Sequence, residues 1–112
     1  PLAGGQTENP LLPMRRLPLS VSPRAEAEIQ EAARWYEGRA QGLGSAFLEI
    51  VEQALSDVEE NPLRFPVVHG DTRRALLKRF PYGVFFRLRT DRIKVVAVMH
   101  LSRNPVRWQK RR

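Results

Sequence analysis

Residues 79–101 read RFPYGVFFRLRTDRIKVVAVMHL, and this stretch decides the class of fold. Its side chains alternate at a period of two, which is typical of strands rather than helices. Two short connections, residues 81–83 and 90–92, interrupt the alternation. Connections this short join antiparallel neighbours, so the region is predicted to form a meander. Three strands are expected, over residues 73–80, 84–89 and 93–101.

The expected middle strand divides its side chains between two faces. One face holds Val84, Phe86 and Leu88, and the other holds Phe85, Arg87 and Arg89. The first set is predicted to cover the helices, and the second to face a partner or solvent. The strand that follows is apolar on both sides, which favours a central position in the sheet.

Upstream of these strands the apolar period lengthens to that of a helix. Ser22 before Pro23 is a typical helix start, because Ser can cap a free amide and Pro gives up no needed hydrogen bond. Apolar stripes over residues 25–40 and 43–58 predict two helices joined by a glycine turn. A short strand is expected before them, over residues 17–21. The predicted fold is therefore α+β, with an N-terminal strand and a two-helix hairpin packed on a mainly antiparallel, four-stranded sheet.

Length and composition restrict the possible classes of function. At 112 residues and 12.9 kDa, the chain is expected to form one domain over residues 14–112, with residues 1–13 as a flexible extension. With no Cys and only two His residues, the chain is predicted to have no disulfide, no metal site and no cofactor. No apolar run is long enough to cross a membrane, so a cytoplasmic protein is expected.

Charge is distributed unevenly along the chain. Residues 73–112 contain thirteen Arg or Lys residues and one acid, Asp91, whereas residues 23–60 contain nine acids and three bases. The net charge of +7 therefore conceals a strongly basic C-terminal part. Such a surface is predicted to attract a polyanion or an acidic protein.

Several short motifs occur in a fixed order along the chain. They are PRA at 23–25, WYE at 35–37, GLG at 42–44, NP at 61–62, RFPY at 79–82, DRI at 91–93 and HLSRNP at 100–105. With these motifs, residues 17–112 resemble the RelE/ParE superfamily of bacterial toxins. The resemblance implies the toxin of a type II toxin–antitoxin module, of the kind that acts in plasmid stabilisation and growth inhibition. It also implies an acidic antitoxin that wraps the basic surface and forms a hetero-oligomer with the toxin.

The superfamily includes inhibitors of DNA gyrase and ribosome-dependent mRNA endoribonucleases on one fold, so the fold alone does not choose between them. If the chain is a metal-independent ribonuclease, the resemblance implies Arg74 and Arg103 as catalytic cations and His100 as the acid or base. However, Leu76 and Gly83 stand where ribonuclease members carry basic residues. A terminal catalytic Tyr also has no clear counterpart.

The sequence therefore favours a toxin that binds gyrase and is not an enzyme. The alternative is a ribosome-dependent endoribonuclease, and a second alternative is an RNA-binding module without toxicity. Trp35 and Tyr36 are expected to pack in the core or between the helices. The residues expected to bind the antitoxin or the target are Arg74, Arg79, Arg87, Arg89, Arg103 and Arg107.

Overall fold

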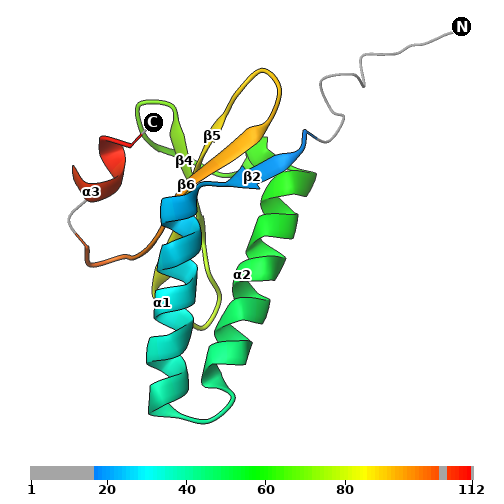
Figure 1. The fold of residues 1–112 in the computed structure, drawn as a ribbon. Helices are drawn as coiled ribbons and strands as arrows, with labels where there is room; N and C mark the ends of the chain where they lie inside the picture. The colour runs from blue at the N-terminus through cyan, green and yellow to red at the C-terminus, as the bar shows by residue number, and fades with distance from the viewer. Residues whose placement is uncertain (1–16, 104–105, 112) are drawn as a thin grey trace, which may run out of the picture.

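The computed structural model describes residues 17–103 and 106–111, so the predicted extension over residues 1–13 lies outside the described range. In chain order its elements are β2 (Leu19–Val21), α1 (Pro23–Arg39), α2 (Leu43–Glu60), the 3₁₀ helix η2 (Pro62–Arg64), β3 (Val67–His69), β4 (Thr72–Leu76), β5 (Tyr82–Leu88), β6 (Ile93–His100) and α3 (Val106–Gln109). Figure 1 shows α1 and α2 side by side as a hairpin, with α3 apart from them near the C terminus.

The strands form one mixed sheet in the order β2-β6-β5-β4-β3. Strands β3 to β6 pair antiparallel, whereas β2 lies parallel to β6, with Leu19 opposite Ile93 and Val21 opposite Val95. The predicted α+β class, the helical hairpin and the meander are confirmed. The sheet is broader than the four strands predicted, because five strands lie within the described residues.

The additional strand, β3, is too short to show a periodic pattern. It has three residues, and its register against β4 is irregular, with Val67 opposite Arg73 and His69 opposite Thr72. The next strand, expected to reach residue 80, ends at Leu76. Beyond it the chain turns back through Arg79, whose φ is 70°. A local turn of this kind interrupts a strand that alternation alone would extend.

The main core lies between the helical hairpin and one face of the sheet. Phe47 and Val58 from α2 meet Val84 and Phe86 from β5, and all four are fully buried. The prediction that Val84 and Phe86 cover the helices is confirmed. A second, smaller cluster lies on the opposite face, which we call the open face; its buried members are Phe85, Val96, Ala97, Met99 and Trp108.

The prediction that Phe85 and Arg87 face a partner or solvent is wrong. Both point away from the helices, as alternation requires, but the C-terminal segment covers them. The Trp108 ring stacks on Phe85 with the centroids 4.4 Å apart, and only 6% of Trp108 is exposed. A four-residue helix has too few residues to carry a periodic signal, so its position could not be read from the sequence.

The turn between α1 and α2 depends on one acid and two glycines. The Glu37 carboxylate accepts hydrogen bonds from the amides of Gly42 and Gly44, both at 2.9 Å. Gly42 has a φ of 85°, and a Cβ on Gly44 would lie 2.5 Å from the carbonyl oxygen of Ala33. The turn therefore needs glycine at one position for conformation and at the other for close packing.

Gly44→Ala is expected to lower the free energy of unfolding by about 1–3 kcal/mol, because backbone must shift to admit the methyl group. Gly38→Ala is the matched control. It lies in exposed helix with nothing within 4 Å of a new Cβ, so it should stabilise by up to about 1 kcal/mol. Urea unfolding of both variants measures the difference, and equal stability would contradict the packing argument.

Glu37 also makes stability depend on pH. Hydrogen bonds from the amides of Gly42 and Gly44 lower the pKa of Glu37 below its ordinary value of 4.5. The stabilisation is therefore complete above about pH 4.5 and is lost as the pH falls through the lowered native pKa. Glu37→Gln should be less stable than wild type at neutral pH, and the difference should shrink in acid. Urea titrations over this pH range test this, with Glu49→Gln as control; a difference that does not vary with pH would refute it.

Candidate functional site

Arg74, from the open face of the sheet, comes together with His100 and Arg103 at the end of β6. They line a hollow of about 220 Å³, which we call the basic hollow. Arg74 extends from β4, His100 ends β6, and Arg103 lies in the loop that follows. The remaining lining residues are Val68, Phe85, Leu101, Trp108 and Gln109. The three residues that the sequence predicted for one site are therefore neighbours, although their roles stay predictions.

The stem of Arg74 has room because the neighbouring position on β5 is glycine. A Cβ on Gly83 would lie 3.1 Å from Cγ and 3.2 Å from Cδ of Arg74. The Nε atom of Arg74 is buried and has no hydrogen-bond partner among the described residues. A buried guanidinium nitrogen without an acceptor is unfavourable.

The ring of His100 is oriented by the residue two places later. Its Nδ1 atom lies 3.1 Å from the amide nitrogen of Ser102, which can only donate, and 2.8 Å from the Ser102 hydroxyl. Nδ1 is therefore the acceptor, and the neutral ring carries its proton on Nε2. In this arrangement His100 can donate a hydrogen bond to a ligand, but Nε2 has no lone pair with which to accept a proton.

Arg103 is the most accessible cation of the three. Its amide donates to the carbonyl of His100 at 3.0 Å, which closes the turn after β6. The side chain is exposed and has no acidic partner among the described residues. No carboxylate lines the basic hollow, so its electrostatics favour a phosphate or carboxylate ligand.

Arg87 does not belong to this surface, contrary to the prediction. Only 6% of the residue is exposed. Its Nε donates to the Thr72 hydroxyl at 2.8 Å, and its other nitrogens donate to the carbonyls of Gln109 and Arg111. Burial lowers the pKa of Arg87, and nearby Asp71 partly offsets this effect. Arg87 therefore holds the C-terminal segment in place.

The other predicted binding residues are dispersed. Arg89 is half exposed and donates to Asp71 at 2.9 Å. Arg79 is exposed in the turn before β5, with its guanidinium 5.2 Å from the centroid of the Phe80 ring, and it does not line the basic hollow. Arg107 lies in α3, and its side chain is outside the described part of the chain.

Sequence reasoning missed the ion pair that fastens the C-terminal segment. Arg111 donates to both carboxylate oxygens of Glu28, at 3.0 and 2.8 Å, and to the carbonyl of Val96 at 3.0 Å. Glu28 also accepts from the amide of Val98 at 3.0 Å. The partners are 83 residues apart, so no local pattern could have indicated this contact.

Arg111→Ala is expected to loosen the C-terminal segment, because it removes the ion pair with Glu28 and the donor to Val96. The free energy of unfolding is expected to fall by about 1.5–3 kcal/mol, the range for hydrogen bonds to charged groups. In a Trp35→Phe background, acrylamide should quench the fluorescence of Trp108 more strongly. Lys110→Ala, an exposed position, is the control; equal quenching in the two variants would show that the ion pair does not hold Trp108.

Comparison with known proteins agrees with this architecture. The model of the family "ParE toxin of type II toxin-antitoxin system, parDE" matches residues 19–105. A solved structure described as "Chromosomal ParDE TA system from P. aeruginosa" is similar, with a TM-score of 0.67 and 19% sequence identity, covering 76% of this chain and 96% of that chain. That level of identity shows a shared fold. No match was found among the curated proteins. No described helix is long and apolar enough to cross a membrane.

Because the family model matches well over half of its residues, the chain belongs to the ParE toxins of type II toxin–antitoxin systems, within the RelE/ParE superfamily.

Proposed function

We propose that the chain inhibits growth by binding DNA gyrase without catalysing a reaction, and that an acidic antitoxin neutralises it in the cytoplasm. The observation that carries the proposal is the basic hollow. It presents Arg74 and Arg103 beside a His that can donate, with no acid in its lining. Such a surface suits an acidic group of a protein partner.

The charge distribution supports an acidic antitoxin as the partner. The exposed cations of the hollow lie in the basic C-terminal part of the chain, whereas most acids lie on the two helices. A disordered acidic segment would be steered toward this face and could become ordered on it. Such a complex would be a toxin–antitoxin hetero-oligomer.

Three features favour binding over RNA cleavage. His100 is held with its proton on Nε2, so it cannot take a proton there. Gly83 lies beside Arg74 and has no side chain that could act as a base. Leu76 is 56% exposed but carries no charge. Trp108, near the position of the missing terminal Tyr, is stacked on Phe85 and carries no group that could exchange a proton at neutral pH.

A ribosome-dependent endoribonuclease is the second candidate. The observation that favours it is the convergence of Arg74, Arg103 and His100 around one hollow, since two cations could stabilise a phosphorane while His100 acted as the acid. A non-toxic RNA-binding module has less support. Phe85 and Trp108 on the open face are buried against each other, so neither offers a free ring for base stacking.

The double variant Arg74→Ala/Arg103→Ala is expected to abolish growth arrest when the chain is produced without antitoxin. The charge-matched control is Arg24→Ala/Arg34→Ala, which removes two exposed cations from α1. Circular dichroism should show both variants folded, because neither pair lies in the core. Growth arrest by the first variant at the wild-type level, or loss of arrest in both variants, would contradict the assignment of this site.

A further inference from the structure

The turn that follows β6 holds a serine hydroxyl against the ring of His100. The Oγ atom of Ser102 lies 2.8 Å from Nδ1 of His100, and the amide nitrogen of Ser102 lies 3.1 Å from the same atom. Because the amide can only donate, Nδ1 is the acceptor and the hydroxyl also donates to it. Ser102 is exposed, so a ligand can reach its Oγ atom. A hydroxyl that donates to an imidazole at this distance is the arrangement of a serine nucleophile and its base.

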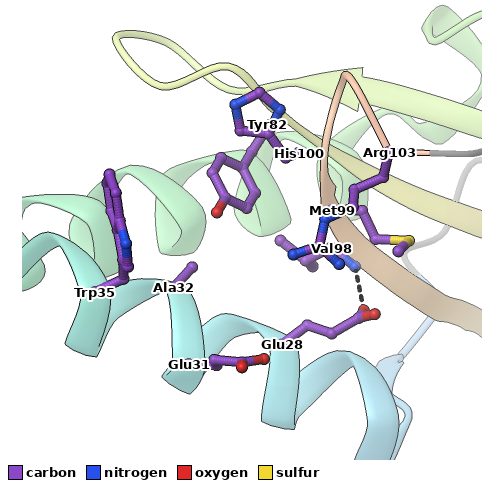
Figure 2. A pocket seen from close by; sticks show the side chains of 9 residues that line it. All are labelled: Glu28, Glu31, Ala32, Trp35, Tyr82, Val98, Met99, His100 and Arg103. Atoms are coloured by element: carbon purple, nitrogen blue, oxygen red, sulfur yellow. Dashed lines mark hydrogen bonds between the residues drawn. The ribbon is translucent and has the colours of Figure 1, made fainter.

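A neighbouring strand holds the imidazole in position. His100 ends β6 opposite Tyr82 at the start of β5, and the two rings meet edge to face with their centroids 5.3 Å apart. Figure 2 shows both rings beside a second hollow, of about 220 Å³, between α1 and the end of β6. Cross-strand packing of this kind orients the ring toward which the Ser102 hydroxyl donates.

The two hollows at the end of β6 differ in charge. Glu28 and Glu31 line the second hollow, whereas no carboxylate lines the basic hollow. Trp35, which we expected to pack in the core or between the helices, also lines the second hollow and is 55% exposed. Arg103 lines both hollows, and Arg74 lines only the basic one. An anionic ligand is therefore favoured on the side of the basic hollow.

The amides of this turn disfavour acyl transfer to the serine. A serine that attacks an acyl group creates an oxyanion, which backbone N–H groups commonly stabilise. The amide of Ser102 already donates to Nδ1 of His100, and the amide of Arg103 donates to the carbonyl of His100. A phosphoryl group instead carries its charge on oxygens that guanidinium groups bind well. Arg103 is exposed and has no acidic partner among the described residues.

The position of the base indicates the class of phosphoryl donor. His100 is engaged at Nδ1 as the acceptor of the hydroxyl proton. A donor whose leaving group departs without a proton therefore requires the least from this site. Acyl phosphates are such donors, because they release a carboxylate.

We propose that Ser102 accepts a phosphoryl group from a small acyl phosphate, with His100 as the general base. The Oγ atom of Ser102 attacks phosphorus, and a new O–P bond forms. The bond between phosphorus and the bridging oxygen breaks, and the carboxylate leaves with the electron pair. The hydroxyl proton passes to Nδ1 of His100, and the imidazolium then gives a proton to water. Nothing is oxidised or reduced.

The phosphoserine would change the charge beside the basic hollow. It carries about −1.5 to −2 charges at neutral pH and would pair with nearby guanidinium groups. Arg74 and Arg103 would then bind an acidic group of a partner more weakly. This consequence rests on the proposed function, but the phosphoryl transfer does not, and its test uses neither growth nor gyrase. The chain is modified once and does not turn over, so the proposal is compatible with a toxin that acts by binding.

The test incubates the full-length protein with acetyl phosphate and locates the phosphoryl group by peptide mass spectrometry. Ser102 should be labelled, whereas Ser45 and Ser56, exposed on α2 and without a hydrogen bond to histidine among the described residues, are internal controls. Ser102→Ala should remove the label. His100→Ala should slow labelling at least about a hundredfold, the lower end of the range for general acid–base catalysis. Imidazole added to His100→Ala should restore part of the rate.

The rescue by imidazole separates a base from a structural role, because a ring that only supported the turn could not be replaced from solution. Circular dichroism should show both variants folded, since Ser102 and His100 lie outside the two clusters of buried residues. The comparison of Ser102 with Ser45 in the wild-type protein does not depend on either variant. Labelling of Ser102 no faster than Ser45, an acetyl group on Ser102 in place of a phosphoryl group, or a wild-type rate in His100→Ala would overturn the proposal.

Discussion

The carboxylate of Glu28 joins three parts of the molecule that are distant in the sequence. It extends from α1, accepts from the amide of Val98 on β6, and pairs with Arg111 near the C terminus. Little of either charged side chain is exposed, 9% for Arg111 and 19% for Glu28, so loss of one partner would leave the other as a poorly solvated charge. This contact fixes α1 against the sheet edge and determines where the C-terminal segment crosses the open face.

The position of that segment determines which cations remain available. The Trp108 ring packs on Phe85, and Arg87 donates hydrogen bonds to the carbonyls of Gln109 and Arg111. The middle of the open face is therefore a small second core. Arg74 and Arg103 lie at the margin of this cover, where the sheet is hollowed. The chain thus divides its arginines between a structural set, buried against the tail, and an accessible set. His100 and Arg103 line the basic hollow and also a second hollow, which lies between α1 and the end of β6.

Local patterns predicted much of this fold, whereas long-range contacts escaped them. Alternation assigned Val84 and Phe86 to the helix side correctly, and the capping residue Ser22 marked the start of α1, where its hydroxyl accepts from the amide of Ala25 at 3.1 Å. Arg74, His100 and Arg103 could be grouped because the predicted hairpin connections place β4 and β6 on either side of β5 in one sheet. The burial of Arg87 could not be predicted, since it depends on residues 109–111 returning across the sheet. Trp35 lies on a helical stripe next to buried Ala32, and only the packing of α1 on β6 shows that its ring points out of the core.

We propose that this ParE-family chain acts by binding gyrase and not by cleaving RNA. The most direct measurement treats two samples with antitoxin-free protein, following DNA supercoiling by gyrase in one and the integrity of ribosome-bound mRNA in the other. We predict loss of supercoiling while the mRNA stays intact. Cleavage of the mRNA with normal supercoiling would contradict it, and would assign the proton transfer to a rearranged His100 or to a group on the ribosome.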